Sequence, residues 1–171
     1  MRTGNETVSR KVVITLRRAT IDDASKLFEW RNDPEVRAVS ESPKAITMKT
    51  HVKWLAERLS FTHAESVWMV NNSEGIPVGS ARVEVVDVRM ARCSLVIDKS
   101  FRNKGFGRAV IKTLKEKIES MNRVALARVH VKNLTSLRAF IANGFHVTST
   151  EHLDHGSFME LSSNADRPEG R

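Results

Sequence analysis

The sequence predicts a single α/β domain with seven strands and four helices in the order β-α-α-β-β-β-α-β-α-β-β. Three observations support this class. The length of 171 residues fits one domain, apolar residues recur with helical spacing in some segments and alternate in others, and no internal repeat or linker divides the chain. We place the domain at residues 12–161, between polar stretches at 1–11 and 162–171 that we expect to be flexible.

The N-terminal third combines one strand with two helices. Residues 12–19 alternate as a strand, and Thr20 followed three residues later by Asp23 is typical of a helix start. This helix is expected to end near Pro34, and a second one is expected over residues 47–59.

The rest of the chain changes to strand periodicity and then alternates strands with helices. Amphipathic helices are expected over residues 108–120 and 135–142. The remaining strands are expected at residues 66–70, 78–86, 91–98, 123–131, 145–150 and 157–161.

The composition argues against several classes of protein. The longest strictly apolar runs, such as Val67–Val70, are far shorter than the ~20 residues of a membrane-spanning helix, so we expect no membrane insertion. The polar N-terminus lacks the apolar stretch of a secretory signal. Cys93 is the single cysteine, which excludes an internal disulfide and agrees with a reducing, cytoplasmic location.

Positive charge is concentrated in one segment of the chain. Ten basic and two acidic residues lie between Lys99 and Lys132, so this segment alone carries the net charge of +8. Such a segment indicates a polyanionic partner, which could be nucleic acid, anionic lipid or a phosphorylated small molecule. A solvated helix face rich in lysine is the alternative interpretation.

A glycine-containing loop within this segment joins a predicted strand to a predicted helix. Gly105 and Gly107 permit positive φ and leave no Cβ near a bound group. Backbone N–H groups at the helix start, backed by the helix dipole, form an anion site, and Arg102, Lys104 and Arg108 add charge beside it. We therefore expect the loop to bind a pyrophosphate. The loop lacks both the Walker lysine and the third glycine of a dinucleotide fingerprint, and a tight turn without function is the alternative.

Two motifs in this region resemble those of a known family. Arg102-x-x-Gly105-x-Gly107 after a strand resembles the pyrophosphate loop of the GNAT N-acetyltransferases. Some thirty residues later, Asn133-x-x-Ser136-x-x-x-Phe140-x-x-x-Gly144-Phe145 resembles their second cofactor motif.

The resemblance covers roughly residues 14–161 and implies a mixed, mostly antiparallel sheet of about seven strands flanked by about four helices. It also implies acetyl-coenzyme A as the co-substrate, with the pantetheine arm pairing with the strand that ends at Ile97. The implied cofactor-binding residues are Leu95, Val96, Ile97, Arg102, Asn103, Lys104, Gly105, Phe106, Gly107, Arg108, Asn133 and Ser136.

The reaction implied by the family is direct attack of a substrate amine on the thioester. A backbone N–H near Val96 and Ile97 is the expected donor to the carbonyl oxygen. The family's usual acid is a tyrosine at the position of Phe140, and this chain contains no tyrosine. Ser136 or a water is therefore expected to protonate the leaving thiolate.

Three side chains are candidate bases. Glu84 lies on the strand before the central one, although it could equally be an exposed strand residue. His130 is a second candidate, for which a structural histidine is the favoured interpretation, and Asp98 is a third. The histidines and Cys93 show no ligand spacing, so we expect no metal site, and we expect Cys93 to fill the core.

The N-terminal third should shape the acceptor pocket. Its Trp-Arg-Asn segment, followed by an Ile…His segment, resembles the amino-sugar-nucleotide N-acetyltransferases of pseudaminic-acid-type pathways. The resemblance implies a small-molecule amine as the acceptor, with aromatic stacking on the sugar or base and arginines on the diphosphate. The implied acceptor-binding residues are Trp30, Arg31, Asn32, Arg37 and His51, and for Trp30 a place in the core is slightly favoured.

Two other functions stay open. The same Trp-Arg-Asn-Asp pattern also resembles enzymes that acetylate the N-terminus of ribosomal proteins, whose site should be acidic rather than basic. A nucleic-acid-binding module would need aromatic residues interleaved with the basic ones, and Phe101 and Phe106 are the only aromatics of the basic segment, so we expect no nucleic-acid partner. The sequence does not fix the oligomeric state, and a homodimer is one option.

Overall fold

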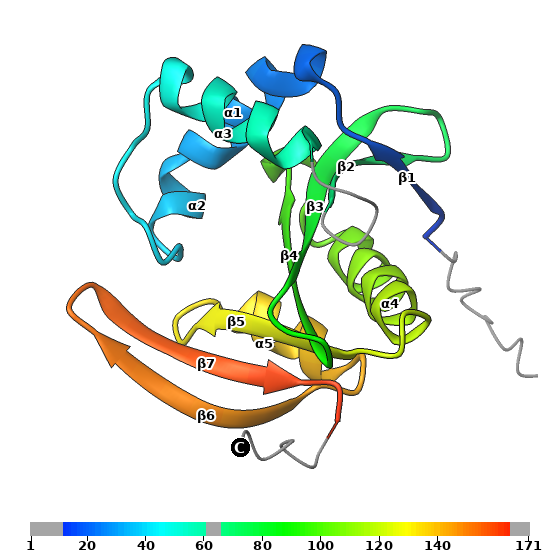
Figure 1. Ribbon diagram of the computed structural model, residues 1–171, viewed down its shortest axis with the longest axis vertical. Coiled ribbons are helices and arrows are strands. Elements are labelled where there is room, and N and C mark those ends of the chain that lie inside the picture. Colours follow the sequence, from blue (N-terminus) through cyan, green and yellow to red (C-terminus); the bar gives the residue numbers. More distant parts are fainter. Residues whose placement is uncertain (1–11, 61–65, 165–171) are drawn as a thin grey trace, which may run out of the picture.

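The computed structural model describes residues 12–60 and 66–164, so residues 1–11 and most of the second expected tail lie outside the described residues. Over these residues a seven-stranded sheet in the order β1-β2-β3-β4-β5-β7-β6 forms the centre of the molecule (Figure 1). Its strands are β1 Ile14–Arg18, β2 Ser66–Asn72, β3 Pro77–Val85, β4 Met90–Ile97, β5 Val124–His130, β6 His146–Leu153 and β7 Gly156–Ser162. Among them, β4 and β5 are parallel and the other neighbouring pairs are antiparallel. This confirms the expected fold class.

Five α-helices and two 3₁₀ turns lie within the described ranges. They are η1 Ile21–Asp23, α1 Ala24–Asn32, α2 Pro34–Arg37, α3 Met48–Ser60, η2 Lys99–Phe101, α4 Phe106–Glu119 and α5 Leu134–Ile141. The sequence predicts four of the α-helices. The fifth, α2, is a single turn that begins at Pro34 and is capped by Asp33, whose carboxylate accepts a hydrogen bond from the N–H of Glu35 at 2.8 Å. One turn is too short to show a helical period, which is why the pattern misses it.

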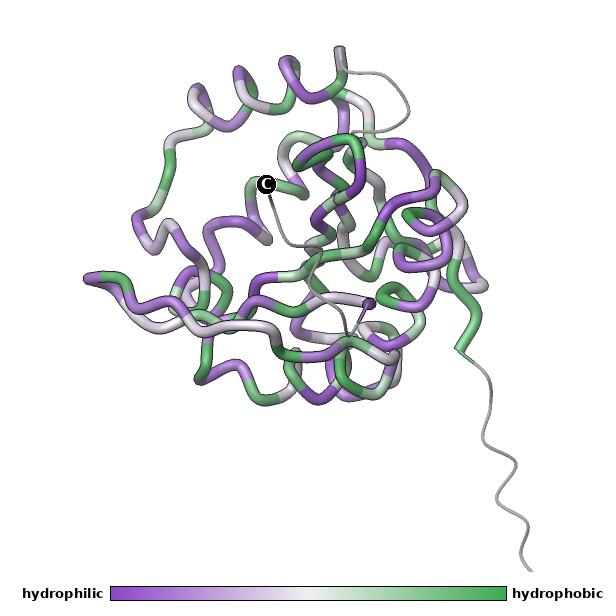
Figure 2. The backbone as a smooth tube through the Cα atoms, turned by 60° about the horizontal axis from the view of Figure 1, so that its bottom comes forward, coloured by the Kyte–Doolittle hydropathy of each residue, from purple (hydrophilic) through white to green (hydrophobic). Residues whose placement is uncertain are grey.

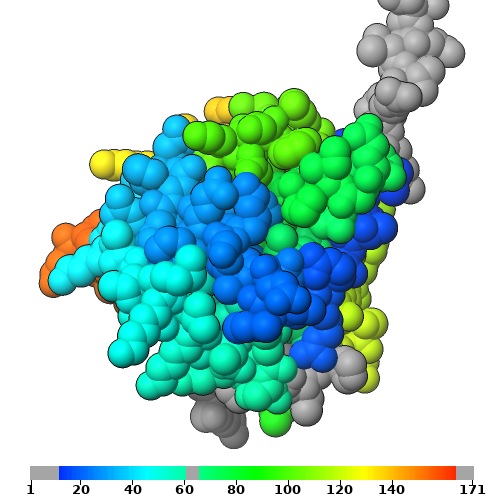
Figure 3. Space-filling view, turned by 90° about the horizontal axis from the view of Figure 1, so that it is seen from above, coloured from blue at the N-terminus to red at the C-terminus, as the bar shows by residue number. Residues whose placement is uncertain are grey.

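The two faces of the sheet carry separate cores. On one face, α4 and α5 pack over the central strands, and Val110, Ile111, Leu114 and Ile118 of α4 are all buried, as their spacing predicts. On the other face, α1 and α3 pack over β2 through a smaller apolar cluster that includes Trp30 and Leu55. Figure 3 shows η1, α1, α2 and α3 as one continuous end of the molecule. The second face is therefore covered by helices only at the β1–β3 side (Figure 1).

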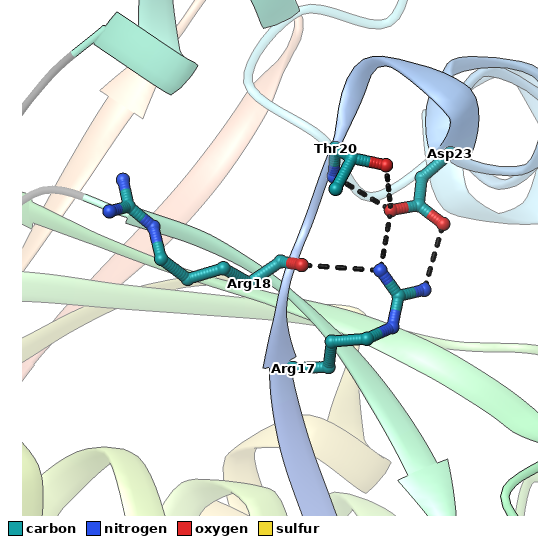
Figure 4. Close-up of polar contacts among 4 residues, drawn as sticks. All are labelled: Arg17, Arg18, Thr20 and Asp23. Carbon is teal, nitrogen blue, oxygen red and sulfur yellow. Dashed lines mark hydrogen bonds and ion pairs between the residues drawn. The ribbon is translucent and has the colours of Figure 1, made fainter.

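An ion pair fixes the corner between β1 and the first helical turn (Figure 4). The guanidinium of Arg17 donates to both carboxylate oxygens of Asp23, each at 2.9 Å. The same carboxylate accepts the backbone N–H of Thr20 at 2.8 Å, so it also closes the capping box of η1. These hydrogen bonds, led by that from Arg17, hold the pKa of Asp23 below its ordinary value despite partial burial.

Hydrophilic and hydrophobic residues alternate over short distances along the chain (Figure 2). In keeping with this, no helix in residues 12–60 and 66–164 is long and apolar enough to cross a bilayer.

Candidate active site

The parallel strands β4 and β5 separate in the middle of the sheet. They pair only from Met90 with Val124 to Arg92 with Leu126. Beyond Arg92 the two strands diverge (Figure 1), while β4 continues to pair with β3 as far as Ile97. One edge of β4 therefore faces an opening in the sheet instead of a neighbouring strand.

Alternation along β4 decides which backbone groups face this opening. The N–H of Asp98 donates to the carbonyl of Val78 on β3 at 2.9 Å. In an antiparallel pair every second residue makes such bonds, so Val96 also faces β3, whereas Leu95 and Ile97 direct their N–H and C=O groups away from it. Of the two residues expected to supply an oxyanion donor, Ile97 is the one whose N–H faces the opening.

The loop that follows β4 presents a concave run of backbone N–H groups. Asp98 caps η2 by accepting the N–H of Ser100 at 2.9 Å. Asn103 and Gly105 then adopt left-handed conformations, with φ of 61° and 86°. Where left-handed and right-handed residues alternate, successive backbone N–H groups turn toward one point. The first N–H groups of α4, from Phe106 onward, also have no hydrogen-bond partners within the helix. This geometry suits an anion, as the sequence predicts.

Three basic side chains lie beside the loop, and two of them, Arg102 and Lys104, have hydrogen-bond partners. The Nε of Arg102 donates to the carbonyl of Ile97 at 3.0 Å, and its guanidinium also pairs with Glu35 of α2. Lys104 donates to the carbonyl of Ser100 at 2.9 Å. Arg108 is exposed on the first turn of α4. A pyrophosphate in the loop would meet hydrogen-bond donors of the right type. The guanidinium of Arg102 would then pair with the pyrophosphate instead of with Glu35.

The second motif lies at the start of α5. Asn133 caps this helix, with its side-chain oxygen accepting the N–H of Ser136 at 3.2 Å. The hydroxyl of Ser136 lies on the first turn of α5, and Ser136 is half-buried. Phe140 is 2% exposed and packs edge-on against Phe145, so it belongs to the core.

The geometry around His130 limits its chemistry. Its Nδ1 accepts the N–H of Lys132 at 3.1 Å, so the neutral ring carries its proton on Nε2. Nε2 faces Gly156, where a Cβ would lie only 2.4 Å away. Burial, helped by the charge of Lys132, lowers the pKa of His130. The ring therefore offers no free lone pair to a substrate amine.

Glu84 points toward two arginines. Its carboxylate accepts a hydrogen bond from Arg58 of α3 at 3.0 Å and pairs with Arg82 of the same strand at 3.4 Å. Asp98 is likewise engaged, by the indole N–H of Trp30 at 2.8 Å and by Lys26 at 3.6 Å. Both carboxylates thus hold elements together in this structure.

The residues expected to bind the acceptor hold the connection between α2 and α3. Asn32 exchanges two hydrogen bonds with the backbone of Ile46, at 2.9 and 3.0 Å. Arg31 donates to the carbonyl of Ser42 at 2.8 Å, and Arg37 donates to the carbonyl of Pro43 at 3.1 Å. Both guanidinium groups therefore position this connection.

The aromatic members of the same set are buried. Trp30 is 4% exposed and His51 2% exposed. His51 lies between the rings of Phe28 and Trp54, and burial lowers its pKa. A shallow cavity of about 270 Å³ between α1 and the end of β4 has Trp30 and Asn32 in its wall beside Asp98, so these residues do lie next to the strand expected to bind the cofactor.

A cluster of charged side chains on the second face of the sheet is absent from the sequence prediction. Arg128 of β5 pairs with three carboxylates: Glu41 at 3.1 Å, Glu151 at 2.6 Å and Glu160 at 3.2 Å. Glu160 lies opposite Arg128 in the β5–β7 register. Residue spacing carries no sign of this cluster, because its members come from three strands and the α2–α3 connection, which are distant in the sequence.

Two further groups have simple placements. Cys93 is buried, and burial raises the pKa of its thiol to about 12, as suits a core residue. No group of three or more His, Cys, Asp or Glu residues in the described part of the chain could hold a metal ion.

A sheet that opens between two parallel strands, beside a helix start with unpartnered N–H groups, is an α/β architecture suited to a phosphorylated ligand. A match to a family model identifies the family within this class. The model of the acetyltransferase (GNAT) domain matches residues 14–146. The chain belongs to the GNAT acetyltransferase family and is an acetyl-CoA-dependent N-acetyltransferase.

Solved structures share the fold at low sequence identity. Spermidine N-acetyltransferase from Vibrio cholerae, in complex with CoA and spermine, is 16% identical with a TM-score of 0.78, over 87% of this chain and 94% of that one. The aminoglycoside acetyltransferase AAC(6')-Ib, in complex with coenzyme A, is 19% identical with a TM-score of 0.72, over 88% and 94%. A domain from Methanocaldococcus jannaschii is 20% identical with a TM-score of 0.76, over 89% and 99%. No curated protein matches this chain.

Proposed function

We propose that this enzyme transfers the acetyl group of acetyl-CoA directly to the amine of a nucleotide-linked amino sugar. The observation that carries the proposal is the opening between β4 and β5, which has the N–H of Ile97 on its edge and the loop of Gly105 and Gly107 at its end. An extended pantetheine arm can pair with the free edge of β4 as a further strand would. The pyrophosphate then reaches the N–H groups at the start of α4.

The chain supplies the groups that the transfer needs. Asn133 borders the cofactor at the start of α5, and the loop residues Arg102 to Arg108 hold the phosphates. The N–H of Ile97 stabilises the carbonyl oxygen as it gains charge. The hydroxyl of Ser136 protonates the leaving thiolate, which is acidic enough to need only a weak acid.

The acceptor assignment is supported by the resemblance of the Trp30–Arg37 segment and of His51 to the amino-sugar-nucleotide enzymes. The neighbours of similar fold are described as complexes with amines such as spermine, which agrees with a small amine as the acceptor. Arg31 and Arg37 donate to backbone carbonyls of the connection between α2 and α3 and are engaged there. We therefore expect other arginines to bind the diphosphate of the acceptor.

Acetylation of a basic protein N-terminus is the second candidate, and one observation favours it. Glu41, Glu151 and Glu160 gather around Arg128 at one end of the charged cluster. Three carboxylates could attract a basic peptide.

Two experiments test the proposal. Isothermal titration at several salt concentrations should show saturable binding of acetyl-CoA at one site, whereas steep salt dependence with DNA and no acetyl-CoA binding would contradict it. Acetyl-CoA consumption should then be compared among a UDP-linked amino sugar, a basic peptide and spermidine. The fastest turnover is expected with the UDP-linked sugar, and faster turnover of the peptide would favour the second candidate.

A further inference from the structure

The second face of the sheet carries a row of charged side chains beside the β4–β5 opening. Alternation places Arg82 and Glu84 of β3 on the face opposite the buried Ala81 and Val83. By the same rule, Arg92 of β4 and Arg128 of β5 lie on this face, and so does Glu160, which stands opposite Arg128. We call these five residues, together with Glu41 and Glu151, the charged floor.

Opposite charges on this floor are separated along its length. Arg128 is surrounded by Glu41, Glu151 and Glu160, so the β5–β7 end has more carboxylates than arginines. Toward β3 the balance reverses. The carboxylate of Glu84 lies 3.4 Å from Arg82 and also accepts a hydrogen bond from Arg58, so two arginines share it.

Arg92 is the least compensated member of the floor. Its guanidinium lies 3.9 Å from the carboxylate of Glu160, which is the edge of ion-pair range. Its Nε is buried and has no hydrogen-bond partner among the described residues. A buried N–H of a charged group without an acceptor is costly, so Arg92 is incompletely compensated in this structure. Its side chain is still 33% exposed, so an anion can approach the guanidinium through its other nitrogens.

Burial and neighbouring charges shift the pKa of two members of the floor. Burial is the main reason that the pKa of Arg82 is lowered; Glu84 and Glu41 oppose the change, and the like charges of Arg58 and Arg92 add to it. Burial likewise raises the pKa of Glu160, even though Arg92 and Arg128 pull in the other direction. A ligand anion beside Arg82 and a ligand cation beside Glu160 would each stabilise the charged form of that side chain.

The floor lies where an acceptor must approach. The opposite face of the sheet is filled by the apolar side chains packed beneath α4 and α5. Arg92 is the last residue of β4 that pairs with β5, so the floor begins where the opening begins. An amine can therefore reach a thioester in the opening from the charged side only.

We propose that the acceptor carries an anionic group as well as its amine, and that Arg82 and Arg92 bind the anion while Glu160 receives the ammonium. This rests on the proposed acetyl transfer. The ammonium gives one proton to the Glu160 carboxylate, and the freed lone pair forms the N–C bond as the C–S bond of the thioester breaks. A second proton leaves the nitrogen, and the thiolate gains one. Phosphate and carboxylate are both suitable anions for two arginines.

The proposed acceptor differs in charge from the amines named for the structural neighbours. Spermidine and aminoglycosides are polycations, and a second or third ammonium at Arg82 and Arg92 would meet like charge. We expect such amines to be poor acceptors here, with a kcat/KM at least about tenfold below that of an amine with an anionic substituent.

The test uses the full-length protein saturated with CoA, so that the loop at Gly105 and Gly107 is occupied. Inorganic pyrophosphate, UDP and glutarate are then titrated calorimetrically, which separates a phosphate from a carboxylate as the preferred anion. Arg92→Gln and Arg82→Gln are each compared with wild type and with Arg89→Gln, which changes an exposed arginine of the β3–β4 turn. The preceding CoA titration checks cofactor binding and folding separately for every variant.

At least one anion should bind the CoA-loaded wild type and the Arg89→Gln variant, and its affinity should fall about tenfold or more in Arg92→Gln or Arg82→Gln. If CoA binds but no anion does, or if both floor variants bind as wild type does, the proposal is wrong while the acetyltransferase assignment stands. If CoA itself does not bind, the proposed function fails first. For Glu160→Gln, kcat should fall and lose its dependence on pH near the pKa of Glu160, and a wild-type pH profile would exclude Glu160 as the proton acceptor.

Discussion

The indole N–H of Trp30 donates to the Asp98 carboxylate at 2.8 Å. This hydrogen bond joins α1, on the expected acceptor side, to the residue that follows β4 and caps the turn before the proposed phosphate loop. Although burial alone would raise the pKa of Asp98, the hydrogen bonds from Trp30 and Ser100 and the charge of Lys26 hold it below its ordinary value. The two halves of the site therefore share one carboxylate.

Replacing Trp30 with Phe tests this connection. The change keeps an aromatic ring in the second core and removes one hydrogen bond to a charged group, so the free energy of unfolding should fall by about 1–3 kcal/mol. Acetyl-CoA affinity should fall as well, because the loop loses an anchor. Lys26→Gln is the comparison variant, since it removes the partly exposed ion pairs of Lys26 to Asp98 at 3.6 Å and to Glu29 at 3.0 Å but leaves the Trp30–Asp98 hydrogen bond in place. Unchanged acetyl-CoA affinity in Trp30→Phe would show that Asp98 holds the loop without α1.

Gly107 is the better of the two loop glycines for testing the proposed phosphate site, because a side chain can be added there without strain. A Cβ there would lie 3.9 Å from Ile97 and 4.0 Å from Leu95, which is ordinary contact, whereas Gly105 has a φ of 86° that strains any other residue. Gly107→Asp should fold normally, since a carboxylate favours a helix start. It should weaken acetyl-CoA binding about a hundredfold by repelling the phosphates, and Gly107→Ala should weaken it less. Equal affinity of the Asp and Ala variants would refute the loop assignment.

The elements could be predicted from the sequence because their cores follow local periods. Val110, Ile111, Leu114 and Ile118 recur at helical spacing, and all four are buried. The proposed phosphate loop could be located in the sequence as well, since its glycines and basic residues lie close together in the chain. The charged floor could not be located in this way, because Glu160 meets Arg92 and Arg128 only through the order of the sheet strands, and Glu84 meets Arg58 only where α3 packs on the sheet. The sequence likewise contains no indication that Arg31 and Arg37 hold the α2–α3 connection. Their partners are backbone carbonyls, which any residue type provides and no sequence pattern marks.

The corner between β1 and η1 should make stability depend on pH. Asp23 has a lowered pKa in the folded protein, so its contribution is present above the ordinary carboxyl pKa and is lost as the pH falls through the folded value. Asp23→Asn should cost about 1 kcal/mol at pH 7, a modest value because Arg17 is half exposed. Urea unfolding at pH 7 and near pH 3 should show a difference between wild type and variant that shrinks at the lower pH. A constant difference would mean that the charge of Asp23 is unimportant.

The hydroxyl of Ser136 is the expected proton donor to the thiolate in a chain without tyrosine. Ser136→Ala should lower kcat by about ten- to a hundredfold while leaving the affinity for acetyl-CoA nearly unchanged. The α5 cap should survive, because it uses the backbone N–H of residue 136 and the side chain of Asn133. Steady-state kinetics together with acetyl-CoA titration make the distinction, and an unchanged kcat would assign the proton to a water.

The most direct test of the central claim is a comparison of kcat/KM, at saturating acetyl-CoA, for a UDP-linked amino sugar, the free amino sugar and spermidine. We predict that the UDP-linked sugar is acetylated fastest, by at least about tenfold over the other two, and that Arg92→Gln removes most of this advantage. Faster acetylation of spermidine than of the UDP-linked sugar by the wild-type enzyme would contradict the account.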